Sequence, residues 1–226
     1  MRRFPLMVFA AGFGSRMGAL TATQPKPLIK VAGRALIDHA LDLAADASRI
    51  VVNTHYRADQ MALHLAGRRV KLSHEPAILE TGGGLKAALP LLGNGPVMTL
   101  NSDAIWTGAN PLAQLAAGWD DRMDALLLLL PAPDAAGFNG PGDFSLENGR
   151  IARANGVAGY AYLGAQIIRT DGLHDIPDPV FSLNRLWDAM IAAGRAYGLV
   201  HRGGWCDVGR PENIAGAEAM LAGRDV

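Results

Sequence analysis

The sequence predicts an α/β protein whose mostly parallel central sheet lies between two layers of helices. Two observations support this prediction. Short apolar runs alternate with helical patterns through the first half of the chain, which is typical of strands joined by crossover helices. The first run, residues 6–10, is apolar throughout, as expected for a strand buried on both faces. The expected architecture is a Rossmann-like three-layer sandwich with a small β-rich lobe.

The individual elements follow from local patterns. Strands are expected at 6–10, 50–53, 70–74, 97–101, 125–130 and 196–200, with a hairpin within 144–151 that turns at Asn148-Gly149. One helix has its apolar residues on one face between 36 and 44, and a shorter one runs from 85 to 92 and ends at Gly93. Ser182 is expected to cap a helix that ends at Gly194, and Pro211 to initiate the last helix.

The chain is expected to form one domain, residues 1–226. Proline and glycine become frequent after Pro131, which marks a change in composition. Residues 1–130 are assigned to the core, 131–182 to a smaller lobe of hairpin and strand over the carboxyl edge of the sheet, and 183–226 to a return to the core.

Composition restricts the choice of partners. Lys and Arg balance Asp and Glu at 21 each, so no global field attracts nucleic acid or an anionic membrane. The apolar runs are too short to span a bilayer, and no cleavable apolar segment precedes the first strand, so we expect a cytoplasmic protein. A single cysteine, Cys206, and six scattered histidines argue against a disulfide or a structural zinc site. A small molecule is the expected partner.

The most informative segment follows the first strand. Residues 9–17 read Phe-Ala-Ala-Gly-Phe-Gly-Ser-Arg-Met, and Pro-Lys-Pro follows at 25–27. Ligands of open α/β sheets bind at such carboxyl ends, where Gly12 and Gly14 let backbone amides approach an anion. Arg16 and Lys26 would add fixed charge for phosphate oxygens.

Three other interpretations of this segment are a dinucleotide site, a P-loop and an ordinary tight turn. A dinucleotide site would have glycine where Met17 stands and an acidic residue about twenty positions later. A P-loop would close with Lys-Ser or Lys-Thr, and none follows Gly12. An ordinary tight turn stays open on this segment alone.

Two aspartates are placed to hold the divalent cation that a bound triphosphate needs. Asp103 directly follows strand 97–101, so its carboxylate is expected at the same sheet edge as Gly12. Asp207 stands in apolar surroundings beside Val208-Gly209. Magnesium prefers hard carboxylate oxygens. Taken alone, each aspartate also fits a helix cap or a turn.

A second glycine-rich segment, Glu-Thr-Gly-Gly-Gly at 80–84, opens the helix expected from 85. Three successive glycines are entropically costly, and a flat nucleobase lying on bare backbone beside the Thr81 hydroxyl would explain them. A plain linker between strand and helix is the alternative.

Together these stretches resemble the nucleotidyltransferases that join a sugar 1-phosphate to a nucleoside triphosphate, and the resemblance runs over nearly the whole chain. The signature of that family is a GxGxR[ML] loop followed by Pro-Lys-Pro, here at 12–17 and 25–27. Within the family, residues 80–84, 142–144 and 205–209 look most like the N-acetylmuramate α-1-phosphate uridylyltransferases of cell-wall recycling. The resemblance implies a GT-A-like nucleotidyltransferase fold, in which 1–130 binds nucleotide and 131–182 binds sugar.

The resemblance also implies site residues, position by position. Ala11, Gly12 and Gly14 would contact the nucleotide through their backbone, and Arg16 and Lys26 would bind the triphosphate. Thr81, Gly82 and Gly83 would contact uracil. Asp103 and Asp207 would bind Mg²⁺. Arg16, Lys26 and Asp103 are the catalytic set. Asn101 would touch ribose or sugar, Asp143 the sugar, and Arg202 the incoming sugar phosphate. Two positions depart from the family pattern, Ser102 where glycine is common and Arg210 where threonine is usual.

The predicted reaction is transfer of UMP from UTP to a sugar 1-phosphate by a monomer or small homo-oligomer. A cytidylyl- or guanylyltransferase acting on another sugar 1-phosphate or on phosphocholine is the nearest alternative. A metal-dependent glycosyltransferase would have an Asp-x-Asp pair, which Asn101-Ser102-Asp103 lacks. A non-catalytic nucleotide-sugar-binding regulatory subunit is the third alternative, and it would have lost Lys26 or an aspartate.

Overall fold

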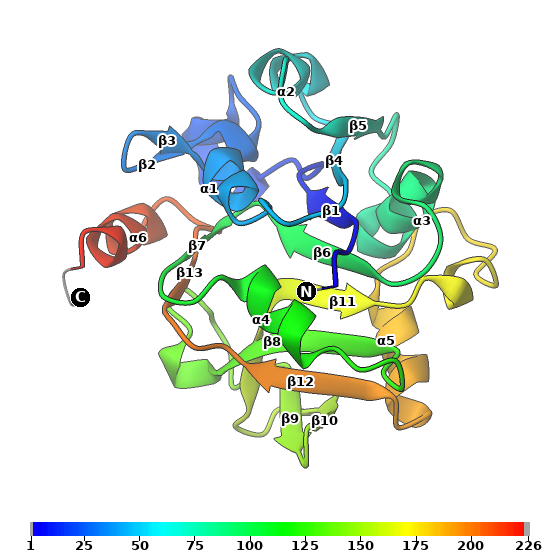
Figure 1. Cartoon of the computed structure of the whole chain (residues 1–226). Coiled ribbons are helices and arrows are strands. Elements are labelled where there is room, and N and C mark those ends of the chain that lie inside the picture. The colour runs from blue at the N-terminus through cyan, green and yellow to red at the C-terminus, as the bar shows by residue number, and fades with distance from the viewer. Residues whose placement is uncertain (1, 224–226) are drawn as a thin grey trace.

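The computed structural model describes residues 2–223 and confirms the three-layer α/β architecture (Figure 1). The central sheet has nine strands in the order β5-β4-β1-β6-β11-β8-β12-β10-β9. Their bounds are Leu6–Phe9 (β1), Ile50–Thr54 (β4), Lys71–His74 (β5), Val97–Asn101 (β6), Ala125–Pro131 (β8), Phe144–Glu147 (β9), Arg150–Arg153 (β10), Tyr160–Ile168 (β11) and Ala196–Val200 (β12).

The strands that position the site are parallel. β1 pairs in parallel with β4 on one side and with β6 on the other, and β5 extends β4 in the same direction. β11 runs antiparallel between β6 and β8. Because β1, β4 and β6 end at one edge, the residues that follow them gather there. Phe9, for example, lies opposite Asn101 in the β1–β6 register.

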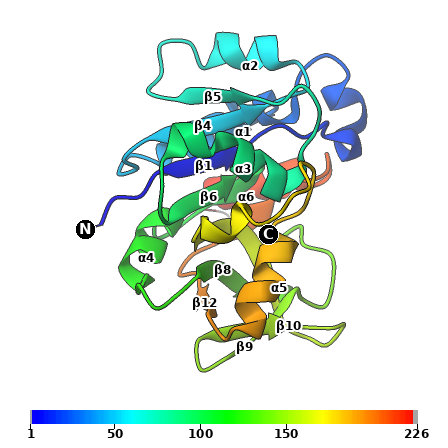
Figure 2. The ribbon, with the colours of Figure 1, turned by 90° about the vertical axis from the view of Figure 1, so that its right-hand side faces the viewer.

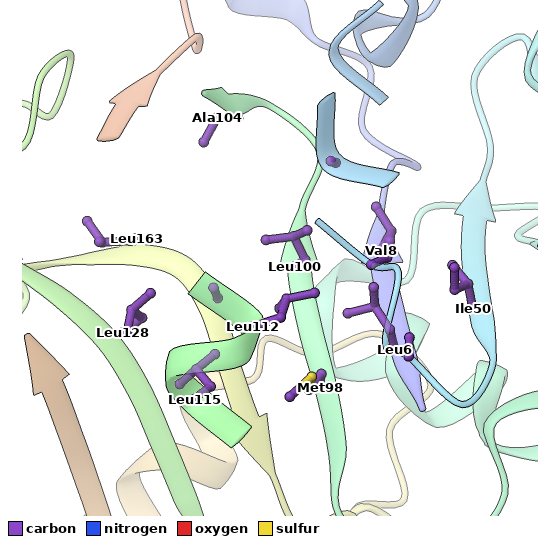
Figure 3. Close-up of a cluster of buried hydrophobic side chains, with 14 of the residues drawn as sticks. Leu6, Val8, Ile50, Met98, Leu100, Ala104, Leu112, Leu115, Leu128 and Leu163 are labelled. Carbon is purple, nitrogen blue, oxygen red and sulfur yellow. The ribbon is translucent and has the colours of Figure 1, made fainter. Parts of the chain in front are cut away.

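Alternating side chains of β1 separate the two helical layers. Leu6 and Val8 pack into a core with α1 (Leu36–Asp42), α2 (Ala58–His64) and α4 (Pro111–Gly118), shown in part in Figure 3. Met7 points to the opposite face, where it joins a second core with α3 (Glu80–Leu92) and α5 (Asn184–Ala192). Figure 2 looks onto this second layer, with α3 and α5 in front of the sheet. Because successive side chains of a strand point to opposite faces of the sheet, β1 contributes residues to both cores.

A third core supports the loop after β1. It packs Met17 and Ile29 against Ile105, Cys206 and Val208. These residues bring together the short helices η1 (Ser15–Thr21) and η2 (Lys26–Leu28) with a two-stranded sheet of β7 (Ala104–Trp106) and β13 (Trp205–Asp207). α6 (Asn213–Leu221) and the ribbon of β2 (Lys30–Val31) and β3 (Arg34–Ala35) cover this side. The first and last parts of the chain thus meet beside the carboxyl edge of the main sheet.

The expected elements are present, with a few differences. α3 begins at Glu80 rather than at 85, so the glycine triplet lies inside the helix. α5 begins two residues after Ser182, whose hydroxyl accepts a hydrogen bond from the Asn184 N–H. The Asn148-Gly149 hairpin is confirmed, with both residues at positive φ. β11 belongs to the central sheet, so the lobe predicted over 131–182 shares a strand with the core.

None of the helices within residues 2–223 combines the length and the apolarity that a bilayer crossing requires.

Candidate active site

A pocket of about 330 Å³ opens at the carboxyl ends of β1, β4 and β6. Its wall includes eight of the residues predicted from the sequence, namely Ala11, Gly12, Gly14, Arg16, Lys26, Thr81, Asn101 and Asp103. Five other predicted residues are not on this wall, namely Gly82, Gly83, Asp143, Arg202 and Asp207. The prediction that the signature loop and the aspartate after β6 lie together is therefore confirmed.

The two signature glycines differ in what the fold requires of them. Gly14 has φ 64°, and a Cβ there would lie 2.7 Å from the Lys26 Cβ and 3.0 Å from the Thr21 Cγ2. The Thr21 hydroxyl also donates to the Gly14 carbonyl, at 3.1 Å. Gly12 has an ordinary φ and nothing within 4 Å of the position a Cβ would take. Gly14 is therefore required by the fold, whereas Gly12 leaves open space toward the pocket.

This contrast gives a matched pair of substitutions. Gly12→Ala is expected to leave the melting temperature within about 2 °C of wild type, because an exposed methyl group meets no protein atom there. It should weaken nucleotide binding at least about tenfold if the triphosphate lies against the loop. Gly14→Ala should lower stability by about 1 kcal/mol or more, since it combines positive φ with a clash. Calorimetric melting and nucleotide titration of both variants measure these effects, and unchanged binding in Gly12→Ala would place the triphosphate elsewhere.

Lys26 and Asp103 form an ion pair inside the pocket. The Lys26 Nζ donates to the Asp103 Oδ2 at 2.6 Å, and the lysine side chain is only 10% exposed. Pro25 and Pro27, both buried, flank the lysine and restrict its backbone. Arg16 is exposed at the pocket mouth and has no carboxylate partner among residues 2–223. The site thus presents one paired cation and one cation open to an anionic ligand.

Asp207 lies next to this pair. Burial, followed by the charge of Asp103, raises the pKa of Asp207 to about 6, while Lys26 and Arg16 act in the opposite direction. Asp207 ends β13 and Asp103 directly precedes β7, the strand paired with β13, and the Val208 N–H donates to the Asp103 carbonyl at 2.8 Å. Two mutually repelling carboxylates fit a magnesium ion, which commonly takes one or two carboxylates and completes its shell with water and phosphate oxygens. No cluster of three His, Cys, Asp or Glu side chains suited to a metal occurs within 2–223.

The glycine triplet packs against the protein itself. A Cβ on Gly82 would overlap the ring of Phe181, one on Gly83 the carbonyl of Pro179, and one on Gly84 the carboxylate of Glu75. The N–H groups of Gly82 and Gly83 both donate to the Phe181 carbonyl, at 2.9 and 3.0 Å. The expectation that these two glycines offer bare backbone to a base is wrong, because the segment before α5 already covers them.

Three polar residues on the pocket wall received no role from the sequence. Asn53 at the end of β4 is 3% exposed and Glu75 after β5 is 1% exposed, and both line the pocket. Glu80, also on the wall, has φ 59°, an unusual conformation for a residue other than glycine. Such backbone strain often accompanies a binding function. Two signals are present in the sequence: an asparagine within the apolar run 50–53, and the position of Glu80 at the start of the glycine-rich segment.

The three residues expected at the sugar have different surroundings. Asn101 is on the wall, packed over Gly164 of β11, where a Cβ would lie 2.7 Å from the Asn101 Nδ2. Asp143 is exposed at the entry to β9, and its Oδ2 accepts from the Tyr162 N–H at 2.9 Å. Arg202 is exposed in the turn between β12 and β13, where its N–H donates to Gln114. The structure brings only Asn101 of the three to the pocket.

Ser102, where the family commonly has glycine, is accommodated by the sheet. Its hydroxyl donates to the Phe9 carbonyl at 2.7 Å, and the side chain is 3% exposed. The serine therefore ties the end of β1 to the residue before Asp103, and it removes no ligand.

Comparison with known proteins agrees with this geometry. A family model described as the MobA-like NTP transferase domain matches residues 6–136. The N-acetylmuramate alpha-1-phosphate uridylyltransferase of Caulobacter vibrioides is 43% identical, with 96% of each chain covered. The enzyme of that name from Neisseria meningitidis serogroup B is 34% identical, over 95% of this chain and 96% of the relative.

A solved structure shows the same fold. HddC from Yersinia pseudotuberculosis, complexed with GMP-PN, has a TM-score of 0.77 and 19% identity, and the match covers 96% of this chain and 99% of that chain. The family model covers more than half of the residues, and the two uridylyltransferases match almost end to end. The chain therefore belongs to the nucleotidyltransferases with a MobA-like NTP transferase domain.

Proposed function

We propose that the protein transfers UMP from UTP to N-acetylmuramate α-1-phosphate, giving a UDP-sugar and pyrophosphate. The observation that carries this proposal is the gathering of Arg16, Lys26 and Asp103 around one pocket, with Asp207 beside it. Two anionic substrates must meet in such a reaction, and this site holds both the cations and the metal-binding carboxylates that the meeting needs. The names of the two full-length relatives support the choice of nucleotide and sugar.

The triphosphate is assigned to the signature loop. The backbone of Ala11, Gly12 and Gly14 borders the pocket, and Arg16 is free to bind phosphate oxygens. Lys26 reaches the same region from η2 and can exchange Asp103 for a phosphate by turning its flexible stem. Asp103 and Asp207 would hold Mg²⁺, which when bound neutralises phosphate charge and polarises the α-phosphate.

The base is assigned to the wall formed by Glu75, Glu80 and Thr81. Glu75 presents a buried carboxylate, an acceptor suited to the ring N–H of uracil or guanine. Cytosine carries a ring acceptor at that position, so a carboxylate would disfavour it. The wall thus supports UTP over CTP, and the relatives support UTP over GTP.

The proposed reaction depends on the positioning of the two substrates rather than on proton transfer. A phosphate oxygen of the sugar phosphate attacks the α-phosphorus, the new P–O bond forms, and the bond to the bridging oxygen breaks in line with it. That oxygen leaves with its electron pair as pyrophosphate, which Arg16 and Lys26 stabilise. The nucleophile is already ionised, so no general base is needed. Asn101 at the pocket wall, Asp143 and Arg202 are the groups we assign to the sugar phosphate.

A substrate panel tests the proposal. Pyrophosphate release is expected to be fastest with UTP and N-acetylmuramate α-1-phosphate, compared with CTP, GTP and TTP and with glucosamine, glucose and mannose 1-phosphates. Mg²⁺ should be required, so excess chelator should abolish turnover and added Mg²⁺ restore it. A strong preference for CTP or GTP would contradict the uridylyl assignment, and turnover with another sugar only would contradict the muramate assignment. A cytoplasmic, monomeric or small oligomeric enzyme of peptidoglycan recycling completes the proposal.

A further inference from the structure

Glu75 is a buried carboxylate without a cationic partner. Its Oε1 accepts from the Asn53 Nδ2 at 2.7 Å and its Oε2 from the Leu79 N–H at 3.2 Å. Among residues 2–223, no Lys, Arg or His side chain forms an ion pair with it. Burying a carboxylate in this way is costly unless its lone pairs are satisfied. Two donors leave part of the acceptor capacity of the carboxylate unused, and Glu75 is one of the residues that line the pocket.

Asn53 joins this carboxylate to the start of the signature loop. Its Oδ1 accepts from the Ala10 N–H at 2.6 Å while its Nδ2 donates to Glu75. A carboxamide is the side chain of this size that offers both an acceptor and a donor. The two partners also fix its orientation, because a flipped amide would set its NH₂ against the Ala10 N–H. One side chain therefore couples β1, β4 and the residue after β5.

The Asn53–Glu75 pair packs closely against Gly84, where a side chain would not fit. A Cβ on Gly84 would lie 2.6 Å from the Glu75 Oε1 and 3.2 Å from the Asn53 Nδ2. The third glycine of the triplet is therefore needed for the Asn53–Glu75 contact. Since the pair is almost fully buried, neighbouring side chains hold it in place.

We propose that Asn53 is a positioning residue for the nucleotide: it fixes the Glu75 carboxylate relative to the signature loop, so that base and triphosphate are bound at a set spacing. This inference rests on the proposed function for the place of the nucleotide. Asn53 acts through Glu75 and the Ala10 amide, and it need not touch the substrate. Loss of its donor should weaken UTP binding and leave the affinity for the sugar phosphate unchanged.

The test begins with Asn53→Asp, a near-isosteric change that keeps the acceptor for Ala10 and removes the donor to Glu75. We expect the dissociation constant for UTP, measured by calorimetry, to rise at least about tenfold. The KM for UTP should rise with it, whereas the KM for the sugar phosphate should stay within about twofold. Asn94→Asp, the same chemical change at an exposed position beyond the far end of α3, is the matched control and should bind as wild type.

The double variant N53D/E75Q tests whether Asn53 acts through its hydrogen bond to Glu75 or only by filling space. The introduced carboxylate would accept from the new amide NH₂ at 75, whose oxygen still accepts from the Leu79 N–H and faces the base. UTP affinity is expected to return to within about threefold of wild type, because the two changes are coupled. E75Q alone should bind more weakly than the double variant, because the introduced amide NH₂ would meet either the Asn53 NH₂ or the Leu79 N–H, and both of these are donors.

Wild-type affinity in N53D, or a double variant as weak as N53D, would overturn the role of Asn53. If N53D alone melts below the assay temperature, the double variant decides by itself: binding more than about tenfold weaker than wild type contradicts the proposal. Titrations with CTP, GTP and TTP accompany the series. A wild-type preference for another nucleotide contradicts the uridylyl assignment, and the Asn53 comparison is then made with that nucleotide.

Discussion

Asp103→Ala is expected to reduce pyrophosphate release from UTP and sugar phosphate by at least about a thousandfold, with the fold intact. Asp103 is the pocket carboxylate nearest to Lys26, and we assign it to Mg²⁺ together with Asp207. Without it, the charge of the triphosphate and the attacking phosphate is poorly neutralised where they meet. Asp207→Ala should produce a loss of the same order, because both carboxylates serve one cation.

Steady-state release assays at saturating substrates measure this loss, and calorimetric melting checks the fold. Asp175→Ala, at an exposed aspartate away from the pocket, is the control and should retain full activity. Raising Mg²⁺ should not restore either pocket variant fully. Near-normal turnover in Asp103→Ala or in Asp207→Ala would refute the metal role of that residue.

Lys26→Ala is the second large effect expected. One fixed charge at developing phosphate charge is worth about 3 kcal/mol or more, so kcat should fall roughly a hundredfold or beyond. The loss should fall on kcat more than on the KM for UTP, because the departing pyrophosphate gains charge in the transition state. Lys26→Arg should recover little, since a planar guanidinium does not reproduce the compact ammonium group that lies 2.6 Å from the Asp103 Oδ2.

Lys30→Ala provides the control, because this lysine is exposed four residues further along the chain. Single-turnover measurements would separate the chemical step from product release. A loss smaller than about fivefold in Lys26→Ala would mean that the lysine only packs beneath Gly14.

The parts of the site that the sequence predicted are those encoded locally. Gly14, Arg16 and Lys26 lie within one short segment at a strand end, so their meeting follows from the chain itself. Asp103 follows a buried strand, and parallel strands end at a common edge. The two-residue turn at Asn148-Gly149 is likewise a local matter.

What could not be predicted depends on partners distant in sequence. Gly82 and Gly83 were assigned to a base because glycine shows where space is needed, and the sequence does not say what fills it. Phe181 fills it here, from about a hundred residues downstream. The sequence around Asn53 and Glu75 assigns no role to either residue. Their role is indicated only by the hydrogen bonds of Asn53 to Glu75 and to Ala10.

The sheet was harder to predict for a similar reason. A strand was expected within the smaller lobe over 131–182, whereas β11 lies in the central sheet between β6 and β8. Its antiparallel insertion leaves no local mark, because strand order is decided by which edge is open when the chain returns.

In the Lys26–Asp103 ion pair, each side chain is the counter-ion of the other. A free divalent ion would have to compete with the Lys26 ammonium group for Asp103. A triphosphate would offer Lys26 another partner, which would release Asp103. In the function that we propose, uptake of metal and uptake of nucleotide would therefore be thermodynamically linked, each raising the affinity for the other. On this proposal, Asp103 would exchange its lysine partner for a metal ion when a triphosphate binds.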